Sequence, residues 1–235
     1  MTNGDENARW LKLLSLAVHE FRSPITVVNG YLKMVLNAKD SGLGDQQRRM
    51  LEDAARSCAR LTAIVAEMSE LGTLEAANAK FHRTPVDLRG ILSEAAASLP
   101  PVPDREIAVT VATADKPAIV SADHARLKVA LASVLTALRR ELVTTTELLV
   151  RQEVRSSDGQ SSAWIAIGDA DAITTVAAAG PGGLVPFDEW RGGNGLSLVV
   201  ARRVLNAHGG KIWSLADGTS AKSTAAIMLP LSSPQ

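Results

Sequence analysis

The chain has 235 residues, of which 46% are hydrophobic, and its 25 basic and 25 acidic side chains give a formal net charge of zero. This balance gives no support for attraction to nucleic acid or to a membrane surface. The single cysteine, Cys58, excludes an intramolecular disulfide framework and a cysteine-based zinc site, and it is typical of a reducing cytoplasm. We expect no signal peptide and no membrane span, because the N-terminus lacks a basic region with an apolar core and no apolar run reaches about 18 residues.

The first predicted element is a long helix over about residues 6–38. Apolar residues recur there at spacings of three and four, which places them on one face of a helix: Leu14, Ala17, Phe21, Ile25, Val28, Leu32 and Val35. A second row at the same spacings, called the polar stripe below, is entirely polar: Ser15, His19, Arg22, Thr26, Asn29 and Lys33. We therefore expect His19 to point to water, away from a packed seam.

The neighbours of His19 favour nucleophilic chemistry. Glu20 can accept a hydrogen bond from one imidazole nitrogen, which leaves the other nitrogen unprotonated. Pro24 lies inside the predicted helix, where proline costs about 3 kcal/mol, and its missing N–H would have bonded the carbonyl of Glu20. A kink and a freed carbonyl are thus expected at the His19–Glu20 pair, and a local rule broken beside a reactive side chain often marks function. The simpler interpretation is a solvated surface histidine beside a chance proline.

The second predicted helix runs over about residues 45–77, after a break at residues 40–44. Its apolar positions form a heptad seam, in which Cys58 fits as a core residue: Leu51, Ala54, Cys58, Leu61, Val65, Met68 and Gly72. Two long antiparallel helices expose too much apolar surface to stand alone. We therefore expect a homodimer that buries both seams in a four-helix bundle.

A linker over about residues 78–85 leads to a second domain, so that we expect a helical hairpin over residues 1–80 and an α/β domain over residues 84–235. Helices are predicted at about 87–99, 123–142 and 195–208. Strands are predicted at about 106–113, 118–120, 147–154, 163–167, 211–215 and 223–231, and a Gly/Ala-rich loop at 169–183. An antiparallel sheet with helices on one side would make this half an α+β sandwich.

The sequence His-Glu-Phe-Arg-Ser-Pro-Ile, which begins at His19, resembles the H-box of bacterial sensor histidine kinases, usually written H-E-[LF]-R-[ST]-P-[LI]. The following Thr26 and Gly30 also fit. In that family the histidine is phosphorylated and passes its phosphoryl group to an aspartate of a response regulator receiver domain. The resemblance implies His19 as phospho-acceptor, with Glu20 orienting its ring. It also places Ser23 where kinases of the family have the residue that aids phosphatase activity.

The second domain resembles the ATP-binding domain that follows the H-box in histidine kinases. Its best match is Gly-Asn-Gly-Leu-Ser-Leu from Gly193, similar to G-x-G-L-G-L, with His-Gly-Gly from His208 downstream. The resemblance implies that Asp169, Gly193 and Gly195 are what remains of a nucleotide site. Where the family has two asparagines on the helix after Asp123, this chain has Ser133 and Ala137. Where the family has two glycines shortly after the aspartate that matches Asp169, this chain has Asp171 and Ile173.

We therefore favour a phosphorelay histidine phosphotransferase that uses no cofactor and no metal of its own, since a methyl group at position 137 cannot hold Mg²⁺. Its partners would be response regulator receiver domains and an upstream phosphodonor protein. Because we expect no sensor and no membrane helix, the signal or the phosphoryl group must come from another protein. Arg22, Ser23 and Thr26 would contact the receiver. The alternatives are a soluble histidine kinase that uses ATP and Mg²⁺, and a non-catalytic dimeric adaptor that binds a receiver.

Overall fold

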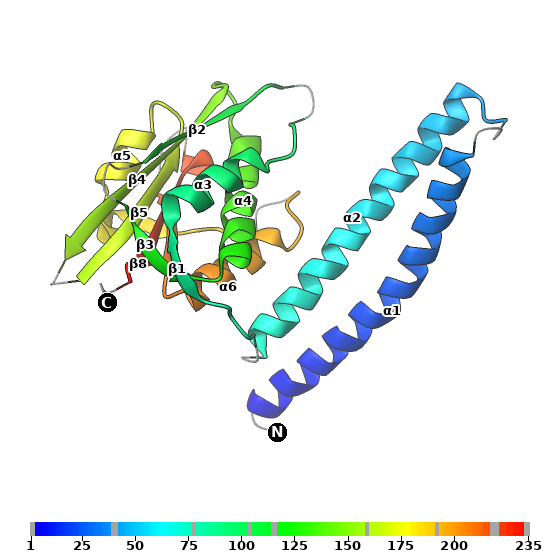
Figure 1. Ribbon diagram of the computed structural model, residues 1–235, viewed down its shortest axis with the longest axis horizontal. Helices are drawn as coiled ribbons and strands as arrows, with labels where there is room; N and C mark the ends of the chain where they lie inside the picture. Colours follow the sequence, from blue (N-terminus) through cyan, green and yellow to red (C-terminus); the bar gives the residue numbers. More distant parts are fainter. Residues whose placement is uncertain are drawn as a thin grey trace. The chain divides into compact units, whose positions relative to one another are not determined.

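The computed structural model describes residues 3–38, 42–76, 79–102, 105–113, 117–157, 160–190, 193–216 and 221–232. The chain divides into two compact units, Met1–Ala79 and Lys80–Gln235, which are taken in turn below (Figure 1). Residues 40–41 of the predicted break and residue 78 of the predicted linker lie outside the described residues. No helix among the described residues is long and apolar enough to cross a membrane.

The first unit is a hairpin of two long helices, α1 (Asn3–Asn37) and α2 (Asp45–Glu75). α2 begins after Gly44, whose backbone N–H donates to Oε1 of Gln47 at 3.0 Å and so satisfies one of the polar groups that a helix end leaves open. The seam between the helices buries Leu14 and Val18 of α1, and Cys58 and Val65 of α2. The Cys58 thiol also contacts the carbonyl oxygen of Ile25 at 3.5 Å, so this cysteine is a core residue, as predicted.

The predicted apolar stripe of α1 was only partly right. Leu14 is buried, but Phe21, Val28 and Val35 of that stripe are 53%, 50% and 40% exposed, and Val18, which the prediction left out, is buried. The reason is that apolar side chains occupy well over half of the α1 circumference, so a hairpin partner covers only one edge of them. The remaining apolar face, called the open apolar face below, consists of Trp10, Leu13, Leu16, Phe21, Val27, Val28, Tyr31, Met34 and Val35.

The second unit is a sandwich built on a six-stranded sheet in the order β2-β4-β5-β8-β7-β6, with a separate two-stranded sheet of β1 and β3. The strands are β1 (Thr84–Asp87), β2 (Ala108–Thr113), β3 (Ile119–Ala122), β4 (Glu147–Ser157), β5 (Gln160–Gly168), β6 (Leu184–Pro186), β7 (Lys211–Leu215) and β8 (Ala225–Pro230). The helices are α3 (Leu88–Ala97), α4 (His124–Glu141), α5 (Ile173–Ala178) and α6 (Ser197–Ala207), with short 3₁₀ turns η1 (Pro181–Gly183) and η2 (Ala221–Ser223).

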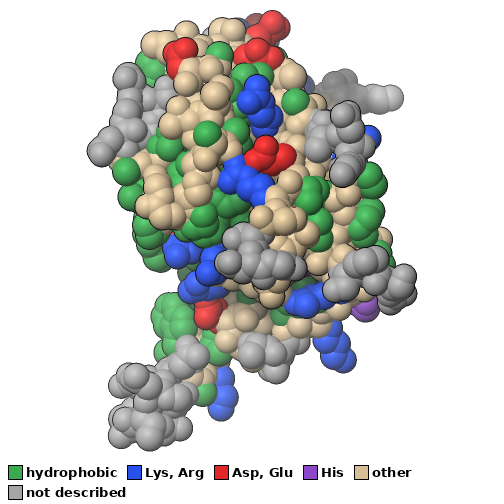
Figure 2. All heavy atoms as spheres, turned by 90° about the vertical axis from the view of Figure 1, so that its left-hand side faces the viewer, with side chains coloured by type: hydrophobic (Ala, Val, Ile, Leu, Met, Phe, Trp, Pro, Cys, Tyr) green, Lys and Arg blue, Asp and Glu red, His purple; other side chains and the backbone are tan. Residues whose placement is uncertain are grey.

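The main core lies between the sheet and α3, α4 and α6, while α5 packs on the opposite face (Figure 1). α3 and α4 are capped by aspartates: Asp87 accepts from the N–H of Arg89 and Asp123 from that of Arg126, both at 3.1 Å. On the opposite face, Ile173 and Val176 of α5 pack with Trp164 of β5. Figure 2 shows Lys and Arg side chains interspersed with Asp and Glu on the face it displays, in keeping with the zero net charge.

The predicted fold class is confirmed, with three corrections in detail. β2 pairs with β4 in parallel, because the crossover through β3 and α4 brings the chain back in the same direction, so the sheet is mixed rather than antiparallel. The segment predicted as a loop over residues 169–183 contains α5 and η1. β1 and β6 were not predicted: β1 begins in the segment predicted as a linker, and the three residues of β6 are too few to show a period.

Candidate functional site

His19 lies on the exposed surface of α1, where its side chain is 78% exposed. Its Nδ1 atom is 3.3 Å from Oε1 of the adjacent Glu20, itself 70% exposed. With the proton on Nδ1, the imidazole donates to Glu20, and the lone pair of Nε2 is directed away from that contact into solvent. The predicted pairing is therefore present, and it suits the tautomer that carries its proton on Nδ1 and leaves the Nε2 lone pair free.

α1 continues through Pro24 without interruption. Proline has no N–H, so the carbonyl of Glu20 lacks the donor that a helix normally supplies four residues later. Two residues further, the Thr26 hydroxyl donates to the carbonyl oxygen of Arg22 at 2.8 Å. Arg22 and Ser23 are both exposed, and Ser23 makes no hydrogen bond to any residue that the structure describes. The residues proposed to assist His19 thus lie within two helical turns of it: Glu20, Arg22, Ser23 and Thr26. The Thr26 hydroxyl is hydrogen-bonded to the backbone, and the Ser23 hydroxyl is exposed.

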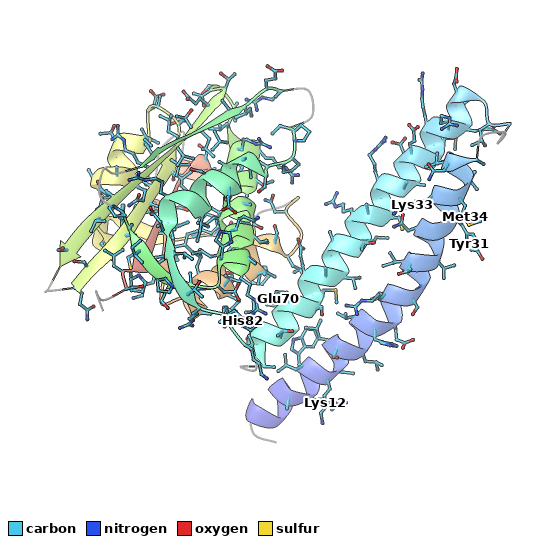
Figure 3. The ribbon with its side chains drawn as sticks, viewed as in Figure 1. Lys12, Tyr31, Lys33, Met34, Glu70 and His82 are labelled. Carbon is cyan, nitrogen blue, oxygen red and sulfur yellow. The ribbon has the colours of Figure 1, made fainter. Side chains whose placement is uncertain are left out.

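The polar stripe around His19 carries cations and no carboxylate. These cations are Arg22 and Lys33, and Figure 3 labels Lys33 towards the end of α1. Lys12, which Figure 3 labels towards the start of α1, lies beside the stripe. Glu20 is the one acidic residue of α1 between residues 7 and 37, and at 100° per residue it lies off the stripe. Tyr31 and Met34 point away from α2 and belong to the open apolar face (Figure 3).

In the second unit, the positions that resemble a metal site are closed. Ala137 of α4 is fully buried, and the Ser133 hydroxyl donates to the carbonyl oxygen of Val129, one turn earlier in the same helix, at 3.0 Å. Among the described residues no cluster of three or more His, Cys, Asp or Glu side chains could hold a metal ion. Ala137 therefore offers no oxygen to a Mg²⁺ ion, and the hydroxyl proton of Ser133 is used within its own helix.

Asp169 is the aspartate that the resemblance expects at this position, but its carboxylate accepts a hydrogen bond within its own turn. It is 3% exposed, and its Oδ1 accepts the backbone N–H of Ala172 at 2.9 Å. Ile173 is buried in the α5 core, whereas Asp171 is exposed. The Asp169 carboxylate thus stabilises the turn that leads into α5.

The glycine turn before α6 is held by α4. Gly193 and Gly195 have φ values of 83° and 59°, a left-handed conformation that explains glycine at both positions. Nη1 of Arg140 lies 3.2 Å from the Gly193 carbonyl oxygen and 3.4 Å from Oδ1 of Asn194. Ser197, where the family has a third glycine, donates its hydroxyl to the carbonyl oxygen of Asn194 at 2.7 Å. The structure does not bring Asp169, Gly193 and Gly195 into direct contact with one another.

His208 joins the end of α6 to Asp123, the residue that caps α4. It is 6% exposed; its Nε2 accepts the backbone N–H of Asp123 at 3.0 Å, and its Nδ1–H donates to the carbonyl oxygen of Val204 at 2.7 Å. Burial, with Arg83 and Arg126 nearby, lowers the pKa of His208 despite its bond to Val204 and the charge of Asp123. Burial alone would raise the pKa of Asp123, but the N–H donors of Arg126 and His82 and the Arg126 charge bring it below the ordinary value.

His208 and Arg126 also hold the segment that begins the second unit, Lys80 to Arg83, through ring contacts and hydrogen bonds. The Phe81 ring meets His208 edge-on at 5.2 Å, and the guanidinium of Arg126 lies 4.7 Å from its centroid. Arg126 also donates to the carbonyl oxygen of Lys80 at 2.7 Å, and Arg83 donates to that of Ala207. Sequence reasoning missed this arrangement, because its members are far apart in the chain and share no motif.

Comparison with known proteins places the first unit in a family. Residues 9–77 match the His Kinase A (phospho-acceptor) domain, a family whose members generally dimerise and interact with response regulators. No curated protein matches this chain.

Two solved structures resemble both units together. One is full-length ShkA in complex with AMPPNP, with a TM-score of 0.70 and 22% identity over 95% of this chain and 46% of that one. The other is the Acinetobacter baumannii histidine kinase AdeS, with a TM-score of 0.57 and 18% identity over 92% of this chain and 98% of that one. This chain thus spans less than half the length of ShkA. It carries a His Kinase A phospho-acceptor domain over residues 9–77, within a histidine kinase-like fold.

Proposed function

We propose that this protein is a histidine phosphotransferase of a two-component phosphorelay. His19 takes a phosphoryl group from the phospho-aspartate of one receiver domain and passes it to the aspartate of a second. The observation that supports this most is the exposed His19 with Nδ1 turned to Glu20, on a phospho-acceptor domain. An exposed nucleophile suits a partner that brings its own reactive group.

The transfer is a substitution at phosphorus. The Nε2 lone pair attacks the phosphorus of the acyl phosphate, an N–P bond forms, and the P–O bond to the aspartate breaks, releasing a carboxylate. The Nδ1 proton stays with the ring and is held by the Glu20 carboxylate, which stabilises the positive charge that the imidazole acquires. A Mg²⁺ ion held by the receiver would neutralise the phosphoryl oxygens. Return of the phosphoryl group to a second aspartate is the same step in reverse.

The residues of the second unit do not fit ATP with Mg²⁺. Position 137 is a buried methyl group, the Ser133 hydroxyl is bonded within its own helix, and the Asp169 carboxylate caps its own turn. Arg140 is joined to the glycine turn at Gly193. No step is therefore assigned to a nucleotide, and we propose that this unit has a structural or partner-binding role.

An active histidine kinase is the second candidate. The specific observation in its favour is that Gly193 and Gly195 keep the exposed, left-handed turn before α6 that would allow close approach of phosphates. A non-catalytic adaptor is the third, and the intact His19–Glu20 pair argues against it. In each case we propose a homodimer, because the open apolar face of α1 needs a partner surface.

The test is reconstitution of a relay between two purified receiver domains. A donor receiver carrying labelled phosphate is mixed with an acceptor receiver, with and without this protein, and with its His19→Ala variant. We expect label on the acceptor only with the wild-type chain, and transient label on His19. Receiver binding without any labelled His19 would instead support the adaptor.

A further inference from the structure

A cavity of about 510 Å³ opens in the second unit near the C-terminal end of α4, beside the segment that joins α3 to β2. Its volume is within the range of about 300–1,000 Å³ that is usual for ligand sites. The lining combines apolar walls with two arginines: Pro101, Val102, Ile107, Arg105 and Arg139. This space is called the arginine cavity below.

Arg139 brings a buried positive charge to the arginine cavity. It is 7% exposed, whereas arginines are almost never fully buried unless they are paired. One terminal nitrogen of its guanidinium donates to the carbonyl oxygen of Pro100, and its Nε has no hydrogen-bond partner among the described residues. Burial, together with the charge of the adjacent Arg140, lowers the pKa of Arg139. Arginine stays protonated all the same, so the cavity holds a desolvated cation.

Arg105 brings a second guanidinium to the arginine cavity, from the segment before β2. Its two terminal nitrogens donate to the carbonyl oxygens of Leu142 and Thr145, which fixes the guanidinium just beyond the end of α4. Glu106 lines the cavity too, but it is exposed and forms no ion pair with any described residue. In the described part of the chain, both arginines therefore bond to neutral carbonyl groups and neither has a carboxylate partner.

A structural clamp would explain part of this arrangement. Positive side chains in the last turn stabilise the C-terminal end of a helix, and Arg139 also ties Pro100 to α4. The clamp explains the hydrogen bond but not the burial, because an arginine can reach a carbonyl oxygen from the surface, as Arg140 does at Gly193. Burying a charge is costly unless an opposite charge accompanies it. The missing opposite charge therefore points to an anion that enters the cavity from solution.

The lining also indicates what kind of anion this is. A guanidinium is a planar fork of N–H donors that matches the oxygen atoms of a phosphate or a carboxylate. Pro101, Val102 and Ile107 add apolar surface on which a bare inorganic ion makes no use of the available contacts. Ligand sites typically join a few polar groups of this kind to an apolar wall. The lining therefore suits an organic molecule with an oxyanion at one end.

We propose that the arginine cavity binds a small organic oxyanion, with its phosphate or carboxylate group against Arg139 and Arg105 and its apolar part against Pro101, Val102 and Ile107. The site is distinct from the glycine turn before α6, which Arg140 contacts. It adds ligand binding to the role of the second unit and does not depend on phosphotransfer by His19.

The experiment is isothermal titration calorimetry on the full chain with four probes. Phenyl phosphate and benzoate carry the two candidate oxyanions on the same apolar body, inorganic phosphate is an oxyanion alone, and phenol is an apolar body alone. The variants are Arg105→Met, Arg139→Lys and Glu106→Gln. The matched control is Arg151→Met, which removes an exposed arginine of β4 that does not line the cavity. Urea unfolding of each variant shows whether it is folded.

We expect one molecule of phenyl phosphate or benzoate to bind per chain, about tenfold or more tightly than inorganic phosphate or phenol. The tighter of the two identifies the oxyanion. Arg105→Met should weaken this binding about tenfold, because a charge-assisted hydrogen bond is lost, and Arg139→Lys should weaken it because lysine lacks the planar fork. Glu106→Gln should tighten it a few-fold, since a negative charge beside the ligand is removed. Arg151→Met should stay within about twofold.

A folded wild-type chain that binds neither phenyl phosphate nor benzoate at millimolar concentration would overturn the proposal. So would binding that is unchanged in both Arg105→Met and Glu106→Gln, because the probe would then occupy another place. A Glu106→Gln variant that is less stable in urea and binds no more tightly would show that Glu106 is the counter-ion of these arginines, and would overturn it as well. Inorganic phosphate that binds as tightly as phenyl phosphate would overturn the organic ligand.

Discussion

Replacing Ala137 with asparagine restores the amide that the histidine kinase resemblance expects at the metal site, and it tests whether that site still exists. Ala137 is fully buried on α4. A carboxamide placed there is overpacked, at a cost of about 1–3 kcal/mol, and its unpaired polar atoms cost about 1–3 kcal/mol more. We therefore expect Ala137→Asn to destabilise the second unit by about 2 kcal/mol or more, without gain of nucleotide binding.

The matched control is Ala125→Asn, an exposed position on the same helix. It carries the same loss of helix propensity, about 0.5 kcal/mol, without burial. Urea unfolding of the full chain, followed by tryptophan fluorescence, reports on the second unit through Trp164, which is 2% exposed. The difference between the two variants isolates the cost of burying the amide. The same samples are then melted with and without Mg-ATP.

Two outcomes would refute this reasoning. If Ala137→Asn were no less stable than Ala125→Asn, position 137 would face open space rather than a packed core. If Mg-ATP raised the melting temperature of Ala137→Asn, the nucleotide pocket would be intact apart from one ligand. A nucleotide at a hundred times its Kd stabilises the folded state by about 2.7 kcal/mol, so the shift would be evident.

Further predictions concern catalysis, assembly and pH. Glu20→Ala should slow transfer from a phosphorylated receiver to His19 by about tenfold or more in single-turnover assays, because Nδ1 loses its acceptor; an unchanged rate would remove Glu20 from the mechanism. Val28→Asp, which puts a carboxylate on the open apolar face, should turn the proposed homodimer into a monomer in light scattering, and an unchanged mass would show that this face is not the dimer interface. Burial lowers the pKa of His208 below its ordinary value of 6.5, so the unfolded state binds a proton at a pH where the folded state does not. The free energy of unfolding should therefore fall as the pH drops below about 6.5. His208→Gln should flatten that dependence in urea titrations, and an unchanged slope would assign it to other groups.

The helices were predictable because their signals are local and long. The heptad seam of α2 and the polar stripe of α1 extend over many turns, so small errors at the ends do not matter. The side of α1 that faces α2 was not predictable, because Leu13, Leu14, Leu16, Ala17 and Val18 surround the helix and several apolar stripes fit equally well. Only the partner helix decides among them.

The second unit shows the same limit. The parallel pairing of β2 with β4 depends on a crossover rather than on either strand. α5 has no side-chain cap, and its Ala- and Thr-rich sequence resembles a loop until Ile173 and Val176 meet the sheet. Its stability comes from tertiary packing, which a local pattern does not contain.

For the site, adjacency in the sequence made the difference. His19 and Glu20 are neighbours, so their contact could be predicted from the motif alone. His208 and Asp123 are 85 positions apart, and their bond became visible only in the folded chain. The close approach of Gly72 to Leu14 likewise depends on how the two long helices meet.

The source of the phosphoryl group on His19 distinguishes a relay protein from a kinase, and phosphohistidine at this position can be quantified by mass spectrometry of the peptide that contains it. The protein is incubated in parallel with Mg-ATP alone and with a phosphorylated receiver domain alone, with His19→Ala as the blank. We expect phosphohistidine from the receiver and none from ATP. Phosphohistidine formed at His19 from Mg-ATP alone would contradict this expectation and make the protein a kinase.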